Sequence, residues 1–296
     1  MRTVLAAFAC ACSSSLLRTA SACYAAAMPA MKPKSVLITG TTSGVGQALL
    51  DHYVTHGVAV IAVNRRRVTE LESRYPGVRH ECVDVRSPGD VAGLVSRLAA
   101  TGQLPEVFIL NAGINRLDND ESFELAPYQE VMATNLYGVV SFVAPLTQLP
   151  ATPACRHIIA ISSLAAYAGN PCALGYSTSK KAVTACFETW ARMYAGTDLV
   201  FQQLMLGPVP TAIYTMGDRL PTWIVRIRSF FSGSLDGTVR AVARLAQSRK
   251  RKLVYPWRAL PLFLASRLAQ WLVPGLLPGR KTLAGKKRRP ARTDGP

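Results

Sequence analysis

Short runs of β-branched and other apolar residues alternate with helical patterns along the middle of the chain. The runs that predict strands cover residues 36–39, 58–63, 78–85, 107–110, 157–161, 199–206 and 253–255. Near-continuous apolar strands that alternate with helices are typical of a parallel sheet covered on both faces. We therefore predict an α/β fold, with a doubly wound parallel sheet of about seven strands in a single domain, residues 32–256, whose ligand lies at the carboxyl ends of the strands.

The first 31 residues fall outside this pattern. They contain no acidic residue, and an apolar stretch with serine and cysteine follows Arg2, which is a signal-like profile. Met28 and Met31 stand just before the first predicted strand. Two interpretations of residues 1–31 stay open, a targeting or anchoring segment and a misassigned start codon, and we exclude this extension from the fold.

The segment 257–279 contains a second feature outside the alternating pattern, an apolar run from Leu260 to Val273. One helical face of this run carries Leu260, Leu264, Leu268, Trp271 and Leu272. At about 13 residues the run is too short to cross a bilayer, which takes about 20, but it suits a helix that lies in the membrane interface. The alternative is a helix docked on the core or on another subunit.

The formal net charge of +17 is concentrated at the same end of the chain. Residues 237–296 contain 15 basic residues and one acid, whereas residues 32–236 contain 17 basic and 16 acidic residues. Residues 280–296 have almost nothing apolar to bury, so we expect a basic, disordered tail. Aromatic and aliphatic residues dominate between the basic clusters, which favours an anionic membrane surface over nucleic acid as the partner. We expect a cytoplasmic protein, attached peripherally to the cytoplasmic face of a membrane.

Cysteine and histidine spacings give no sign of a metal site. The seven cysteines include no CxxC pair, so we interpret Cys82, Cys155, Cys172 and Cys186 as reduced thiols. His52 and His56 are one helical turn apart but lack the glutamate that a zinc protease motif requires between them. We predict no metal.

The first predicted strand runs directly into a glycine-rich turn, and a helix follows. Gly40 permits the tight turn, Gly44 lets the backbone approach a pyrophosphate, and Gly46 allows the helix to pack closely. The helix amides would then face the anion. Such a pattern is a weak signal alone, but the flanking strand and helix strengthen it. Thr42, Ser43 and Val45 complete the predicted phosphate-binding turn.

The end of the second predicted strand indicates which dinucleotide is bound. The sequence there is Asn64-Arg65-Arg66-Arg67, with no carboxylate to bind a ribose diol. Guanidinium groups can form bidentate, charge-assisted hydrogen bonds with a 2′-phosphate. We therefore predict that Asn64, Arg65 and Arg66 bind the cofactor and that NADP(H) is preferred over NAD(H). The alternative is a solvated basic turn.

Six short motifs follow one another along the predicted domain. They are Thr39–Gly46, Asp84, Asn111-Ala112-Gly113, Asn135, Ser163 with Tyr176–Lys180, and Gly207–Thr211. In this order they resemble the TGxxxGxG turn, the adenine-contacting acid, the NAG element, the helix asparagine, the serine with YxxSK and the PG segment of the classical short-chain dehydrogenase/reductase family. The resemblance covers about residues 35–256. Leu206 stands where the family usually has proline, a departure that affects this loop.

This resemblance implies a Rossmann fold and an oxidoreductase that acts on CH-OH or C=O groups with a nicotinamide cofactor. Beyond the glycine turn and the arginines, the residues implied to bind that cofactor are Asp84, Val85, Asn111, Ala112, Gly113, Tyr176, Lys180, Pro208, Val209 and Thr211.

Four residue types in these motifs also make chemical sense by themselves. A carbonyl that accepts hydride gains negative charge on oxygen, so an acid must donate a proton and another donor must hold the oxygen. Tyr176 can be that acid, and because a tyrosine pKa is ordinarily about 10, a cation one helical turn later at Lys180 would favour the phenolate. Ser163 can hydrogen-bond the substrate oxygen. Asn135 would hold a water that links Lys180 to solvent.

The segment after Thr211 has an apolar lining that suits a lipophilic substrate, although it could equally be a flap that completes the core. We expect Tyr214, Met216 and Trp223 to contact the substrate. The leading hypothesis is an NADPH-dependent reductase of a lipophilic ketone or aldehyde, or the reverse alcohol oxidation, in a homo-oligomer at a membrane surface.

Two other classes of function stay open. One is a nucleotide-binding scaffold or redox sensor whose basic tail binds nucleic acid or a partner protein. The other is a dehydratase or epimerase of a nucleotide-linked sugar, which would need a larger domain than the roughly 85 residues after Thr211 provide.

Overall fold

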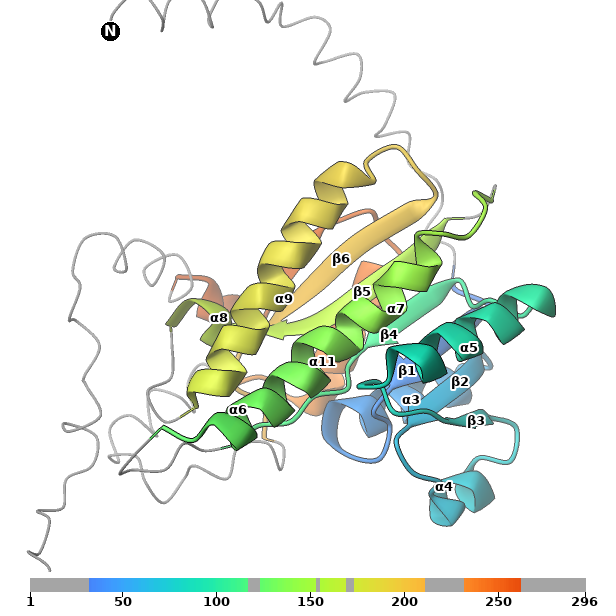
Figure 1. The fold of residues 1–296 in the computed structure, drawn as a ribbon, viewed down its shortest axis with the longest axis horizontal. Coiled ribbons are helices and arrows are strands. Elements are labelled where there is room, and N and C mark those ends of the chain that lie inside the picture. The colour runs from blue at the N-terminus through green and yellow to red at the C-terminus, as the bar shows by residue number, and fades with distance from the viewer. Residues whose placement is uncertain (1–31, 117–122, 153–154, 169–172, 211–231, 262–296) are drawn as a thin grey trace, which may run out of the picture. The chain divides into compact units, whose positions relative to one another are not determined.

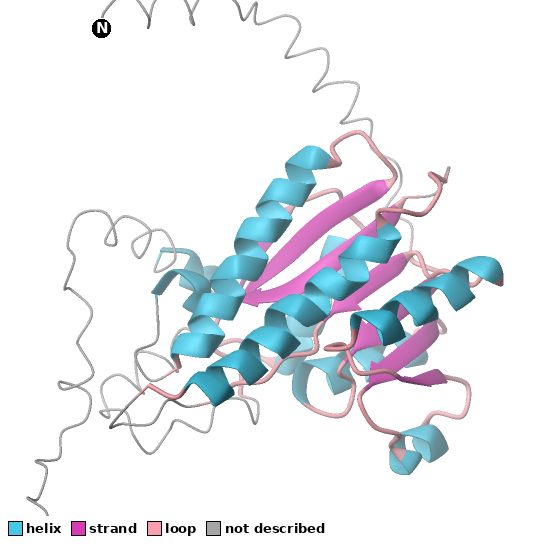
Figure 2. Ribbon diagram, viewed as in Figure 1, coloured by secondary structure: helices cyan, strands magenta, loops and turns pink. Residues whose placement is uncertain are grey.

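A computed structural model describes residues 32–116, 123–152, 155–168, 173–210 and 232–261. Within these ranges seven parallel strands form one sheet in the order β3-β2-β1-β4-β5-β6-β7, with helices on both faces (Figure 1, Figure 2). This arrangement confirms the predicted doubly wound fold. The order reverses between β1 and β4, and sheets of this kind bind ligands at such a reversal.

The elements have the following bounds. The strands are β1 (Ser35–Thr39), β2 (Ala59–Asn64), β3 (Arg79–Cys82), β4 (Val107–Leu110), β5 (Arg156–Ser163), β6 (Leu199–Leu206) and β7 (Lys252–Tyr255). The α-helices are α3 (Gly44–Thr55), α4 (Thr69–Arg74), α5 (Pro88–Ala100), α6 (Leu125–Met132), α7 (Gly138–Leu146), α8 (Ala165–Ala168), α9 (Leu174–Met193) and α11 (Leu235–Ala246). A π-helical turn η1 (Ala133–Tyr137) joins α6 to α7, and a 3-10 turn η3 (Trp257–Ala259) follows β7.

All seven predicted strands are present, but the third ends earlier than its apolar pattern indicates. β3 stops at Cys82, although the Val83 amide still bonds to the Asn64 carbonyl. Beyond it the Asp84 carboxylate accepts a hydrogen bond from the Arg86 amide, 3.0 Å away, and this local turn takes the chain out of the sheet. Asp84 and Val85 therefore face the ligand-binding edge instead of extending the strand.

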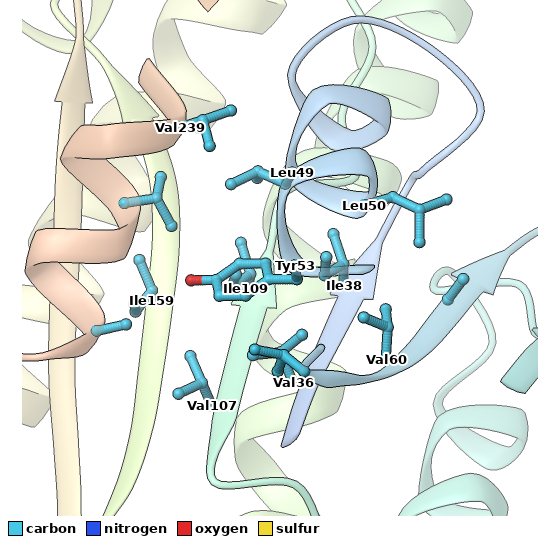
Figure 3. Close-up of a cluster of buried hydrophobic side chains, with 14 of the residues drawn as sticks. Val36, Ile38, Leu49, Leu50, Tyr53, Val60, Val107, Ile109, Ile159 and Val239 are labelled. Atoms are coloured by element: carbon cyan, nitrogen blue, oxygen red, sulfur yellow. The ribbon is translucent and has the colours of Figure 1, made fainter. Parts of the chain in front are cut away.

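Two apolar layers hold the helices against the sheet. On one face α3 and α11 pack on residues that alternate along β1, β2, β4 and β5, including Val36, Ile38 and Ile159 (Figure 3). On the other face α5, α7 and α9 cover the intervening residues, including Leu37, Phe108 and Ile158. The alternation of strand side chains between both layers explains why the strands read as continuous apolar runs.

Tyr53 on α3 brings a polar group into the first layer. Its ring lies among aliphatic side chains and its hydroxyl points toward α11 (Figure 3). The side chain is 3% exposed, and within the described part of the chain the hydroxyl oxygen has no hydrogen-bond partner. Burial therefore raises the pKa of Tyr53 well above its ordinary value.

Several predictions about the rest of the chain can be compared with the described ranges. Cys82, Cys155 and Cys186 are free thiols there, while Cys172 lies outside them. The described residues contain no helix long and apolar enough to cross a membrane, and no cluster of acids, cysteines and histidines that could hold a metal. Residues 1–31, residues 280–296 and most of 257–279 lie outside the described ranges, so the predicted extensions stay predictions.

Candidate active site

The glycine turn after β1 depends on close backbone contacts. Gly40 has a φ of +72°, in the left-handed region, and its amide bonds to the Val63 carbonyl at 2.8 Å. A Cβ at Gly46 would lie only 1.9 Å from the Gly40 carbonyl oxygen. These glycines place the start of α3, and its unsatisfied amides, at the carboxyl edge of the sheet.

A pair of buried polar residues fixes the same turn. The Thr41 amide donates to the Asn64 Oδ1 at 2.9 Å, and the Asn64 Nδ2 donates to the Thr41 Oγ1 at 2.8 Å. Asn64, which the sequence pattern assigned to the cofactor, thus uses its side-chain amide mainly to join β2 to the turn. Thr41 was not predicted, because its role depends on a partner on another strand.

A cavity of about 420 Å³ opens at the point where the strand order reverses. Most of the residues that we predicted to bind cofactor or to act in catalysis line this cavity. They are Gly40, Thr42, Ser43, Gly44, Val45, Asn64, Arg65, Arg66, Asp84, Val85, Asn111, Ala112, Gly113, Ser163, Tyr176, Lys180 and Val209. Residues far apart in sequence therefore converge on one site, as the parallel topology requires.

Some predicted residues do not line the cavity. Gly46 and Asn135 lie behind its wall, and Pro208 belongs to the loop after β6 without facing it. Thr211 and the predicted substrate contacts Tyr214, Met216 and Trp223 lie outside the described residues. The substrate assignments therefore stay predictions.

Asn135 lies in the π-helical turn η1 and is fully buried. Its Oδ1 accepts from the Ile114 amide at 2.8 Å, while its Nδ2 donates to the Ile114 carbonyl at 2.9 Å and to the Ser179 Oγ at 3.1 Å. The side chain thereby ties the loop after β4 to α9. Its predicted role in proton return stays a prediction.

Ser163, Tyr176 and Lys180 form the reactive end of the cavity. The Ser163 Oγ accepts a hydrogen bond from the Ala165 amide at 3.1 Å, which leaves the hydroxyl proton available for another acceptor. Lys180 follows Tyr176 by one turn of α9, and its Nζ lies 5.7 Å from the centre of the tyrosine ring. All three side chains line the cavity, so they can act on one bound molecule.

Lys180 is unusual because it is buried without an acidic partner in the described structure. Its Nζ donates to the Ile161 carbonyl at 2.7 Å, and the side chain is 6% exposed. Burial lowers the pKa of Lys180 from 10.5 to about 8, because a charged amine loses its hydration there. Perturbed lysines in clefts are typical of active sites.

The opposite end of the cavity is strongly charged. Arg65 and Arg66 line it and make no side-chain hydrogen bond or ion pair with any described residue, whereas Arg67 pairs with Glu72 at 2.8 Å. Two unpaired guanidinium groups, together with the amino end of α3, fit an anionic dinucleotide. Sequence reasoning missed Arg86, Arg116 and Glu130 at this end. Arg116 and Glu130 carry no local signal because their contact joins segments 14 residues apart, whereas Arg86 pairs with Asp84 only two positions away.

Fold and site together define a nucleotide-binding α/β protein with a serine, a tyrosine and a buried lysine at its reactive end. A family model described as short chain dehydrogenase matches residues 34–218. The chain belongs to the short-chain dehydrogenase/reductase family, whose members are oxidoreductases that use nicotinamide dinucleotides and act on CH-OH or C=O groups.

Individual relatives agree with this assignment. The chain is 30% identical over 198 residues to a glucose 1-dehydrogenase from Gluconobacter oxydans, covering 61% of this chain and 71% of that protein. It is 32% identical over 180 residues to 11-beta-hydroxysteroid dehydrogenase 1A from Arabidopsis thaliana, covering 56% and 49%. A short-chain dehydrogenase/reductase from Burkholderia phymatum, solved in complex with NAD, has the same fold with a TM-score of 0.67 at 20% identity, covering 83% of this chain and 96% of that one.

Proposed function

We propose that this protein is an NADPH-dependent reductase of a lipophilic ketone or aldehyde, or catalyses the reverse oxidation, at a membrane surface. The observation that carries the proposal is one cavity with Ser163, Tyr176 and Lys180 at one end and the unpaired Arg65 and Arg66 at the other. The glycine turn lies between these two ends, where its backbone can bind the pyrophosphate of a dinucleotide.

In this proposal each residue has a defined role in carbonyl reduction. The reduced nicotinamide supplies hydride to the carbonyl carbon when the cofactor is bound. The Ser163 hydroxyl donates a hydrogen bond to the carbonyl oxygen, and the Tyr176 hydroxyl transfers its proton to that oxygen to give the alcohol. Lys180 favours the resulting phenolate through its charge, and its amine is placed to bind the nicotinamide ribose.

The cofactor preference rests on the arginines. A 2′-phosphate would find two guanidinium groups that no described acid engages, and no carboxylate stands at the end of β2 for a ribose diol. We expect the Arg65→Ala/Arg66→Ala variant to lose affinity for NADPH by about tenfold or more, with little change for NADH. Equal losses for both cofactors, or a parent enzyme that prefers NADH, would contradict the assignment.

The lipophilic substrate and the membrane surface rest on separate observations. A relative named for a hydroxysteroid makes a lipophilic alcohol chemically reasonable. At the last described turn, Trp257 is 74% exposed and Leu260 is 41% exposed, and Arg258 between them is also exposed. Exposed tryptophan, leucine and arginine at the start of a basic segment suit the interface of an anionic bilayer.

The decisive experiment incubates the full chain with NADPH and a series of ketones and aldehydes of increasing chain length, while the absorbance of NADPH is followed. We expect turnover that rises with chain length, and none with the Tyr176→Phe control. Turnover only on short polar substrates would reject the lipophilic class. No turnover on any substrate, with nucleotide binding intact, would favour a nucleotide-binding scaffold or redox sensor instead.

A further inference from the structure

The adenosine end of the cavity contains carboxylates as well as arginines. Asp84 follows β3, and Glu130 projects from α6, and both line the cavity that also contains Arg65 and Arg66. A bare carboxylate near a 2′-phosphate would repel it and would compete for the guanidinium groups that bind it. The site therefore needs some means of neutralising both acids.

Each of these acids is engaged by an arginine of its own. The Arg86 Nη2 lies 2.6 Å from the Asp84 Oδ2, and the Arg86 Nε and backbone amide both lie 3.0 Å from Oδ1. The Arg116 Nε lies 2.9 Å from the Glu130 Oε2, and its Nη2 lies 3.1 Å from Oε1. Both contacts have the two-pronged geometry that best matches a carboxylate.

The ion pairs lie within electrostatic reach of Arg65. The bonded arginine is the main cause that lowers the pKa of each carboxyl, Arg86 for Asp84 and Arg116 for Glu130, and the charge of Arg65 lowers both further. Because Arg65 interacts electrostatically with both acids, loss of Arg86 or Arg116 would leave a carboxylate free to attract the Arg65 guanidinium. The same carboxylate would act directly on an incoming phosphate.

We propose that Arg86 and Arg116 set the preference for a 2′-phosphate without contacting it, by neutralising Asp84 and Glu130 so that Arg65 remains available. They are positioning residues that act through Arg65. This inference rests on the proposed NADPH dependence and extends it from the strand-end arginines to two ion pairs, one within the loop after β3 and one between the loop after β4 and α6. The ion pairs are partly exposed, so the expected effects are modest.

The test compares equilibrium dissociation constants of NADPH and NADH, measured by nucleotide fluorescence on the full chain without substrate. We expect Arg116→Gln to lower the NADPH preference about three- to fivefold, because it leaves Glu130 unpaired. The Arg116→Gln/Glu130→Gln double variant should recover the parent preference, since the carboxylate is gone as well. Arg86→Gln should lower the preference in the same direction.

Two controls make the result specific. Arg97 on α5 pairs with Glu81 on β3 at 3.3 Å, and neither residue lines this cavity, so Arg97→Gln should leave the preference unchanged. The effect of Arg116→Gln should also shrink in high salt, which screens charges that are partly exposed. Circular dichroism spectra and unfolding transitions that match the parent exclude a folding defect.

The inference and the proposed function can fail separately. If the parent prefers NADH, or if Arg65→Ala/Arg66→Ala leaves the preference unchanged, the proposed cofactor is wrong. If those results hold but Arg116→Gln weakens both cofactors equally, or the double variant stays as low as the single one, the ion pairs have only a structural role and this inference is wrong.

Discussion

Lys180 carries an amino group into the protein interior, where only the Ile161 carbonyl accepts from it in the described structure. The pKa of about 8 means that folding disfavours the protonated form that the proposed mechanism uses. An active site can retain such a residue because transition-state stabilisation outweighs the loss of folding stability. This conflict makes Lys180 a place where activity and stability can be separated experimentally.

Replacing Lys180 with methionine should raise the free energy of unfolding of the nucleotide-free protein by about 1–3 kcal/mol at pH 7, since the buried charge is removed. The difference in the free energy of unfolding between the variant and the parent should narrow as pH rises from 8 toward 10.5. In this range the folded parent releases the Lys180 proton before the unfolded chain does, so the parent gains stability. Urea unfolding of both proteins at pH 7.0, 8.5 and 9.5 measures the difference. A constant difference across this range would mean that Lys180 is not perturbed.

Replacing Tyr176 should impair the chemical step of the reaction and not the binding of the nucleotide. Tyr176→Phe removes one hydroxyl and retains the ring beside Lys180, so turnover should fall by at least about 10³-fold while NADPH still binds. Single-turnover kinetics and a nucleotide titration on the same preparation separate these effects. Substantial residual turnover in a folded variant would exclude Tyr176 as the proton donor.

At the scale of elements, α3 packs against the sheet with an unsatisfied polar atom. The hydroxyl of Tyr53 lies in the layer shared with α11 and has no partner among the described residues. Tyr53→Phe preserves the ring and removes this cost, so we expect the free energy of unfolding to rise by about 1 kcal/mol. Chemical denaturation tests this, with Tyr75→Phe as a control that should destabilise, because the Tyr75 hydroxyl does donate to Asp51.

Sequence patterns predicted the helices and strands well where one local property determines the structure. Buried parallel strands must be apolar throughout, so runs such as Val107–Leu110 were recognisable. The glycine turn and the Tyr176 to Lys180 spacing were recognisable because a sharp turn and one helix face are local properties. The end of β3 was missed because Val83 and Val85 continue the apolar pattern, while the turn at Asp84 depends on its bond with Arg86.

The parts of the site that sequence could not predict are contacts between distant loops. Arg116 and Glu130 belong to different elements, and nothing in their local sequence indicates that they pair. Thr41 and Asn64 meet only because β1 and β2 are neighbours in the sheet. The π-helical turn at Asn135 is likewise fixed by the hydrogen bonds that its side chain makes to Ile114 and Ser179.

At the scale of the whole molecule, a test of membrane attachment has to remove the tail without disturbing the catalytic domain. Ala259 is fully buried, and a Cβ at Gly207 would lie 3.6 Å from the Ala259 Cβ, so η3 belongs to the catalytic domain. A truncated protein should therefore end at Pro261, after η3. It retains the packing of η3 and removes the basic tail.

We expect the full chain to sediment with anionic liposomes at low salt and less so at high salt. The chain that ends at Pro261 should sediment clearly less than the full chain, because it keeps Trp257, Arg258 and Leu260 but lacks the basic tail. Each lysine or arginine of the tail that reaches an acidic leaflet contributes about 1 kcal/mol, and the predicted apolar face from Leu264 to Leu272 would add burial that salt does not screen. Neutral liposomes serve as the control. Equal sedimentation of both proteins would exclude the tail as the attachment.

The contact between η3 and the loop after β6 determines how an attached enzyme would meet its substrate. A Cβ at Gly207 would lie 3.0 Å from the Pro256 Cδ, and Gly207 and Val209 line the cavity. The last described residues of the chain therefore follow directly on a residue that packs against the cavity wall. A tail-bound enzyme would take its substrate from the lipid phase, and its rate would follow the mole fraction of substrate in the bilayer. Adding empty vesicles at constant total substrate should then slow the reaction, because the added lipid lowers the mole fraction of substrate in the bilayer.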